Sequence, residues 1–279
     1  MAKLARATLA TRLAAQGGTV ALVPFLFGAA NRELIPGTVL NRLLVDLGLT
    51  SAAARTLVAR MKKHGQLASI RRGRGVDYRL DGPFAASFQR VRDYPSRPPL
   101  PWTGSFHAVH YHVPEEVRPF RDALRRVALL SGYGLLQQGV LISVVDHGEA
   151  IAEMLDQCPP AARVYRTRLV MDTADAKRAA CHAWELEEVG RMFERHIGAL
   201  SKLLSTTPDK PEPSARTLRT LSGVVRTPMT DTLREPELPV ELLPPSWPGP
   251  RLRELAAEVG ARFGPATAAY VDHLISTEP

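Results

Sequence analysis

The chain has 279 residues, a formal net charge of +8 and a globular composition, with 45% apolar and 23% charged residues. No apolar run approaches the roughly 18 residues that are needed to cross a bilayer. The two cysteines, Cys158 and Cys181, form neither a CxxC pair nor a metal-binding pattern. These features argue against a membrane protein, a disulfide scaffold and a structural zinc site, and we expect no metal and no cofactor.

The positive charge is confined to the first third of the chain. Residues 1–100 hold 16 Lys and Arg against 5 Asp and Glu, a net charge of +11, whereas residues 101–279 hold 20 against 23, a net charge of −3. Between Thr50 and Arg79, eight basic residues accompany the single acid Asp77. Such a local basic segment is typical of a nucleic-acid-binding module, although charge alone is equally compatible with a solvated arginine-rich surface.

After an N-terminal arm (residues 1–18), which favours a short amphipathic helix, the pattern predicts three helices. The first runs from Thr19 to about Gly28 and contains Pro24, and the second spans about 36–47. The third spans 51–64, with Thr50 as a natural N-cap. Its apolar residues recur at helical spacing and should face the core: Ala54, Leu57, Val58 and Met61.

The opposite face of the third helix and the hairpin that follows it predict contacts with DNA. Strands at 67–70 and 76–80 flank a glycine-containing turn that carries three arginines, as in the wing of a winged helix. We expect Arg55 and Thr56 to read base edges, and the lysines and hairpin arginines to hold phosphates. The full predicted set is Ser51, Ala52, Arg55, Thr56, Arg60, Lys62, Lys63, Arg71, Arg72 and Arg74. The competing interpretation is a generic amphipathic core helix.

A helix over about 84–94 closes the predicted DNA-binding domain (residues 19–94), and four prolines in residues 95–101 indicate a stiff linker. The next segment, residues 102–207, predicts the β-α-β-β-α-β order of a ferredoxin-like domain followed by a long helix. Its predicted elements are a strand at 106–113, a helix at 114–132, a hairpin at 133–145, a helix at 148–157, a strand at 163–171 and a helix at 184–204.

The first strand of this segment carries three histidines, and only His110 and His112 share a face. No carboxylate accompanies them at a recognisable metal-binding spacing, so we expect no metal site.

Residues 208–279 should form a small C-terminal helical domain, with one helix that begins after Gly249 and a final helix around Tyr270. The predicted fold class is therefore α+β, with an N-terminal winged helix-turn-helix, a central ferredoxin-like domain and a C-terminal helical domain.

Several stretches resemble a known family when they are taken in this order. They are ARTLVARM at 54–61 with YRL at 78–80, VPEE at 113–116 with GYGLLQQGV at 132–140, and LPVELLPPSWPG at 238–249, with AWEL at 183–186 as a smaller fourth. Over about residues 19–274 the chain resembles the phenylacetic-acid-degradation repressors, the PaaX-like transcriptional regulators. It departs from their pattern at His112 and Glu235, where members usually carry Asp.

The resemblance implies a cytoplasmic bacterial repressor that associates with the nucleoid when bound to its operator. It implies a homodimer on a palindromic site in double-stranded DNA, released by a small effector such as an acyl-CoA. We expect the effector site between the ferredoxin-like and C-terminal helical domains. Its candidate residues are Trp184 and Trp247 as walls, and Arg166, Arg168 and Arg234 as partners of an acyl-CoA phosphate. An equally open interpretation makes both tryptophans core anchors and the arginines surface charges.

Two other functions compete with a ligand-controlled repressor. The first is a metal-dependent nuclease on the ferredoxin-like domain, but such an enzyme needs an Asp where this chain has His112. The second is an architectural nucleic-acid-binding protein that responds to no ligand. No glycine signature for a nucleotide and no hydrolase motif occurs in the sequence, so we predict that the chain is not an enzyme.

Overall fold

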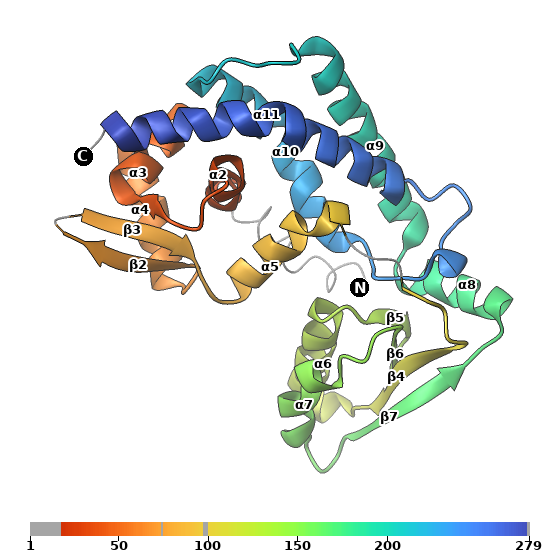
Figure 1. Ribbon diagram of the computed structural model, residues 1–279. Coiled ribbons are helices and arrows are strands. Elements are labelled where there is room, and N and C mark those ends of the chain that lie inside the picture. Colours follow the sequence, from red (N-terminus) through yellow and green to blue (C-terminus); the bar gives the residue numbers. More distant parts are fainter. Residues whose placement is uncertain (1–17, 74, 97–99, 278–279) are drawn as a thin grey trace. The chain divides into compact units, whose positions relative to one another are not determined.

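The computed structural model describes residues 18–73, 75–96 and 100–277 (Figure 1). It is a mixed α+β protein with a helical C-terminal region. The expectations for the arm (residues 1–17), for Arg74 and for the middle of the proline linker (97–99) lie outside the described residues. The described chain forms two compact units. The helical unit comprises residues within 13–97, 193–233 and 249–279, and the sheet unit comprises residues within 98–192 and 234–248.

The first part of the helical unit consists of three helices and a small antiparallel sheet of order β1-β3-β2. Its elements are α2 (Leu22–Ala30), β1 (Ile35–Pro36), α3 (Gly37–Asp46), α4 (Ser51–Lys63), β2 (Leu67–Arg72) and β3 (Gly75–Leu80). Pro24 does not break α2, because it lies in the first turn, where the backbone N–H has no helical partner to lose. Strand β1 is absent from the sequence prediction, since two residues are too few to show an alternating pattern.

Helix α4 forms as its local sequence predicts. The Thr50 hydroxyl accepts a hydrogen bond from the Ala53 amide at 3.2 Å, which caps the helix. All four residues of the predicted inward stripe are buried, and the register of β2 on β3 runs from Leu67 opposite Leu80 to Arg72 opposite Gly75. Gly73 adopts a left-handed backbone with φ of 58° at the tip, which a residue without a side chain does at little cost.

Three further helices complete the helical unit together with the second part of α9 (Leu186–Thr206): α5 (Gly82–Arg92), α10 (Ala215–Asp231) and α11 (Gly249–Thr277). Helix α10 was not predicted. The prediction of two helices after Gly249 was wrong, because α11 is one helix of 29 residues. Phe263 and Ala266 are buried on either side of Pro265, so continuous packing of this face offsets the backbone hydrogen bond that the proline removes.

A buried carboxylate joins α3 to both C-terminal helices. Asp46 accepts hydrogen bonds from Arg42 at 3.2 Å and from the Tyr270 hydroxyl at 2.6 Å, and its backbone carbonyl accepts one from Arg219 at 2.8 Å. Burial, together with the neighbouring Asp46 carboxylate, raises the pKa of Tyr270 to about 12. The helix that precedes α4 is therefore fixed to α10 and α11 by polar as well as apolar contacts.

We predict that Tyr270→Phe lowers the free energy of unfolding by about 1.5–3 kcal/mol, because a hydrogen bond to a carboxylate is lost. The raised pKa means that the folded state keeps the phenol neutral. The hydrogen bond of Tyr270 therefore contributes fully to stability below the unfolded pKa of about 10, and this contribution is lost as the pH rises towards 12. Urea denaturation should show that the free energy of unfolding of the wild type falls towards that of the variant as the pH rises from about 10 to about 12. A difference between wild type and Tyr270→Phe that stays constant between about pH 10 and pH 12 would contradict the assignment.

The sheet unit contains a four-stranded antiparallel sheet of order β5-β6-β4-β7. The elements follow the predicted order of strands and helices: β4 (Ser105–His112), a 3-10 turn (Glu115–Val117), α6 (Arg118–Leu130), β5 (Gly134–Gln137), β6 (Val140–Ser143), α7 (Gly148–Asp156) and β7 (Arg163–Val170). Val109 and Leu141 of the sheet, Leu124 of α6 and Ile151 of α7 belong to one buried core, so both helices pack on one face of the sheet.

Helix α8 (Thr173–Ala183) is the main element of this unit that the sequence interpretation missed. Its signals are present: Asp172 caps the helix by accepting from the Asp175 amide at 2.9 Å, and alanines recur at helical spacing on its buried side (Ala176, Ala179, Ala180 and Ala183). The predicted helix from 184 to 204 is α9, which begins two residues later. Glu185, in a left-handed conformation with φ of 51°, separates it from α8.

The proline-rich segment that contains residues 235–248 packs on this same unit. A 3-10 turn (Val240–Leu242) contacts α8, and the Trp247 indole donates to the buried carboxylate of Glu235 at 2.8 Å. Residues 208–279, which we predict as one C-terminal domain, therefore contribute to both compact units. The domain boundaries remain a prediction, because compact units and sequence domains need not coincide.

Candidate nucleic-acid interface

The outer face of α4 is a continuous exposed surface that contains the predicted base-reading residues. It lies opposite the buried stripe that packs against the core. All of its predicted members are exposed: Ser51, Ala52, Arg55, Thr56, Arg60, Lys62 and Lys63. Its first turn contains only small side chains and no acid, so the helix can approach a base edge closely and its positive end remains compatible with a phosphate.

Arg55 and Thr56 differ in what they can still offer to DNA. No other side chain or carbonyl within residues 18–73, 75–96 and 100–277 forms a hydrogen bond or ion pair with Arg55, so its guanidinium donors remain available. The Thr56 hydroxyl donates to the Ala52 carbonyl at 2.9 Å. Thr56 therefore contributes a hydroxyl acceptor and a methyl group, whereas Arg55 is the stronger candidate for a specific contact.

The hairpin of β2 and β3 supplies a second basic surface. Arg71 and Arg72 are exposed, and Arg72 lies 3.6 Å from the buried carboxylate of Asp77. This pair offsets part of the charge that the sequence assigns to the hairpin. Arg79, which is also exposed on β3, adds a cation that the predicted set does not include.

The histidines of β4 do not form a metal site with neighbouring acids. His107 lies 3.6 Å from Asp146, whose other oxygen accepts from the Gly148 amide at 2.8 Å and lies 3.5 Å from Arg166. The Gly148 amide, followed by the nearby cations, holds the pKa of the Asp146 carboxyl below its usual value. Within the described part of the chain, no cluster of three or more His, Cys, Asp or Glu side chains could hold a metal ion.

Each of the five predicted effector-binding residues already has a partner within the sheet unit. Trp184 is buried and donates to the Gly132 carbonyl at 3.3 Å, and Trp247 donates to Glu235. Arg168 donates to the Ser105 hydroxyl at 3.0 Å, Arg166 pairs with Asp146, and Arg234 pairs with Glu188 at 3.2 Å. These contacts are those of core anchors and surface ion pairs, and the effector role of the five residues remains a prediction.

Comparison with known proteins places the chain in a family. Three family models match it: PaaX-like protein over residues 22–82, PaaX protein central Cas2-like domain over 99–180, and PaaX-like protein C-terminal domain over 184–273. The transcriptional repressor PaaX of Escherichia coli (strain K12) is 25% identical over 241 residues, which cover 83% of this chain and 75% of that relative.

A solved structure shares the fold. The uncharacterized protein Rv0674 from Mycobacterium tuberculosis superimposes with a TM-score of 0.57 and 24% identity, over 90% of this chain and 95% of the other. No helix among the described residues is long and apolar enough to span a membrane. The three family models follow one another along the chain in the order of the stretches that carry the sequence resemblance, and the chain belongs to the PaaX-like family.

Proposed function

We infer that this chain is a DNA-binding transcriptional repressor. The observation that carries the inference is the exposed, acid-free face of α4, capped by Thr50 and followed by an arginine-bearing hairpin. The family and the name of the Escherichia coli relative support the same function. Such a protein acts in the bacterial cytoplasm, where the DNA lies.

We propose that α3, α4 and the β2–β3 hairpin act as a winged helix-turn-helix. In this arrangement α4 enters the major groove, with Arg55 towards a base edge, while Arg71 and Arg72 follow the phosphates. The middle of the chain is proposed to be ferredoxin-like, a fold supported by the strand order β5-β6-β4-β7 and by two helices on one face. This domain would carry the winged helix-turn-helix and would not catalyse a reaction.

Binding to selected and random duplexes tests this function. DNA enriched from a random pool by the full chain should bind at least about 10³-fold more tightly than random duplex at the same salt concentration. Affinity for both should fall with salt, because phosphate contacts release counterions. Equal affinity for both duplexes would favour the architectural alternative, and cleavage of DNA in the presence of Mg²⁺ or Mn²⁺ would favour the nuclease.

The repressor is proposed to act as a two-fold dimer, with β7 as the contact between protomers. Strand β7 lies at one edge of the four-stranded sheet, and among the described residues no strand pairs with its outer side. Tyr165 is 60% exposed and Val170 is 78% exposed on this strand. An exposed edge with large apolar side chains is suited to pairing with a second copy of the same strand.

Release from DNA by a small effector is the last element of the proposed function. The resemblance points to an acyl-CoA, held by Arg166, Arg168, Trp184, Arg234 and Trp247. Such a ligand would have to displace the present partners of these side chains, such as Asp146 and Glu188. Gel shifts titrated with a panel of acyl-CoA esters test this point, and a panel that leaves the protein–DNA complex intact at all concentrations would refute it.

A further inference from the structure

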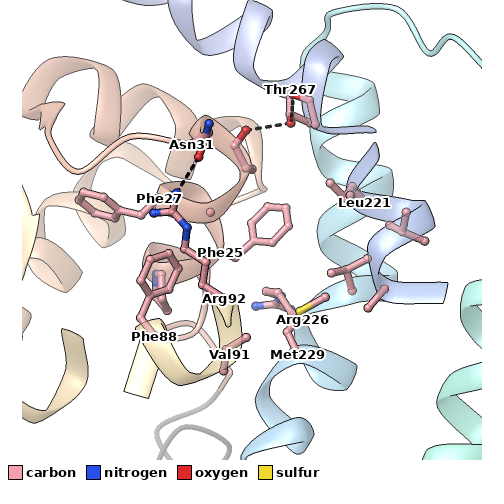
Figure 2. A pocket seen from close by; sticks show the side chains of 18 of the residues that line it. Phe25, Phe27, Asn31, Phe88, Val91, Arg92, Leu221, Arg226, Met229 and Thr267 are labelled. Atoms are coloured by element: carbon pink, nitrogen blue, oxygen red, sulfur yellow. Dashed lines mark hydrogen bonds between the residues drawn. The ribbon is translucent and has the colours of Figure 1, made fainter. Parts of the chain in front are cut away.

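A cavity of about 640 Å³ lies within the helical unit, between α2, α5, α10 and α11 (Figure 2). Its volume is within the range of pockets that hold small organic molecules. Most of its wall is apolar: Phe25 of α2, Phe88 and Val91 of α5, and Met229 of α10 border the space. Phe25, Phe88 and Met229 remain only partly buried, so a ligand would cover apolar surface that the protein alone leaves accessible.

Two arginines supply the charged part of the wall, and among the residues that the structure describes both donate only to neutral acceptors. Arg226 of α10 is partly buried and donates to the carbonyls of Gly18 at 2.8 Å and Ser222 at 3.4 Å. Arg92 of α5 donates to the side-chain oxygen of Asn31 at 3.1 Å. Within the described residues neither guanidinium has a carboxylate partner, and no Asp or Glu lines the cavity. The lining of the cavity therefore contains two cations, partly buried Arg226 and exposed Arg92, and no acid.

The position of Arg226 makes an anionic ligand favourable. Both acceptors of Arg226 are backbone carbonyls, and desolvation by burial lowers the pKa of this guanidinium. A guanidinium matches the geometry of a carboxylate, with two parallel hydrogen bonds, better than that of a neutral oxygen. An anion placed at Arg226 would offset the desolvation, while the phenylalanine-lined wall would favour an apolar group attached to it.

We propose that this cavity binds a small organic acid, with its carboxylate at Arg226 and its apolar aliphatic or aryl body among Phe25, Phe88 and Met229. The site is distinct from the five residues assigned to an acyl-CoA effector, which lie in the sheet unit. The cavity also borders α2 and α5, the helices before and after the DNA-reading segment. The acid is expected to bind the protein in the absence of DNA, so this proposal does not depend on the proposed function.

Calorimetric titration of the full chain with octanoate and with 2-naphthoate tests the ligand class. The matched neutral probes are octanamide and 2-naphthamide, which keep the apolar body and remove the charge. At least one acid should bind, and its amide should bind at least about tenfold more weakly. Absence of binding by both acids, equal binding of acids and amides, or binding of CoA thioesters alone would overturn the proposal.

Two variants locate the ligand. Arg226→Met keeps the length of the side chain and should remove the preference for the acid over its amide. Gly264→Leu should abolish binding, because Gly264 lines the cavity and a Cβ there has no other atom within 4 Å. Leucine is also the better helix former, so α11 should remain folded.

The matched control is Gly198→Leu in α9 of the same unit, where a Cβ also has open space but the cavity is not adjacent. It should bind the acid as the wild type does. Thermal unfolding of each variant without ligand shows that the fold is intact. Wild-type affinity in Gly264→Leu, or an unchanged preference for the acid in Arg226→Met, would place the ligand elsewhere and overturn the assignment.

Discussion

Arg55→Ala is expected to weaken binding to the selected operator by about 1–3 kcal/mol and to relax the preference at one base pair. Arg55 is the cation on the outer face of α4 that follows the small first turn, and no described group competes for its donors. Fluorescence anisotropy with the operator and with duplexes mutated at each position measures both effects. The loss on random duplex should be much smaller than the loss on the operator.

The matched comparison is Arg71→Ala in the β2–β3 hairpin, where the side chain is proposed to meet a phosphate. This variant should weaken the operator and random DNA alike and reduce the slope of log affinity against log salt by about one unit. Arg72→Ala should have a smaller effect, because Asp77 already offsets part of its charge. If Arg55→Ala lost the same affinity for the operator and for random DNA, the assignment would be reversed, and Arg55 would contact a phosphate instead of a base.

Replacing Tyr165 and Val170 together with lysine is expected to convert the proposed dimer into a monomer. Lysines on an edge strand oppose pairing, because two like charges would meet in each copy of the interface. A monomer presents one α4 where a dimer presents two, so operator affinity should fall by at least about two orders of magnitude. Sedimentation equilibrium and anisotropy on the same samples measure the two consequences.

Val240→Lys is the control for this pair. Val240 is 70% exposed in the same unit but lies in a 3-10 turn that contacts α8 and not in β7, so this variant should remain dimeric and bind the operator normally. A wild type that sediments as a monomer, both free and on DNA, would refute the dimer. A double-lysine variant that remains dimeric would place the contact on another surface.

The local elements of this protein could be predicted where their signals lie within a few residues. Thr50 and the apolar stripe that begins at Ala54 predict α4, and the glycines of the hairpin tip predict its turn, because caps, helical periodicity and left-handed backbone are short-range properties. The exposed residues of the proposed DNA-binding face follow from the same stripe. The Arg72–Asp77 pair and the hydrogen bond of Thr56 required side-chain positions that the sequence does not give.

Three helices escaped the sequence interpretation or were divided incorrectly. Helix α8 buries alanines, which carry little hydrophobic contrast, and α10 lies in a part of the predicted helical domain to which no individual helix was assigned, although Ser214 caps it. The sequence interpretation divided the chain after Gly249 into two helices, whereas α11 continues through Pro265 with Phe263 and Ala266 buried on either side. In α11, tertiary packing outweighs one lost hydrogen bond.

The sequence by itself determined the basic N-terminal third, α4 and the hairpin after it, the order of strands and helices between β4 and β7, and the family resemblance. Tertiary structure alone placed Trp184 and Trp247 in buried hydrogen bonds and brought residues around 25, 90, 226 and 264 to one cavity. The reason is the range of the forces involved. Propensity, capping and periodicity act within a few turns, whereas a cavity depends on the summed packing of helices that lie far apart in the sequence, as Phe25 and Gly264 do.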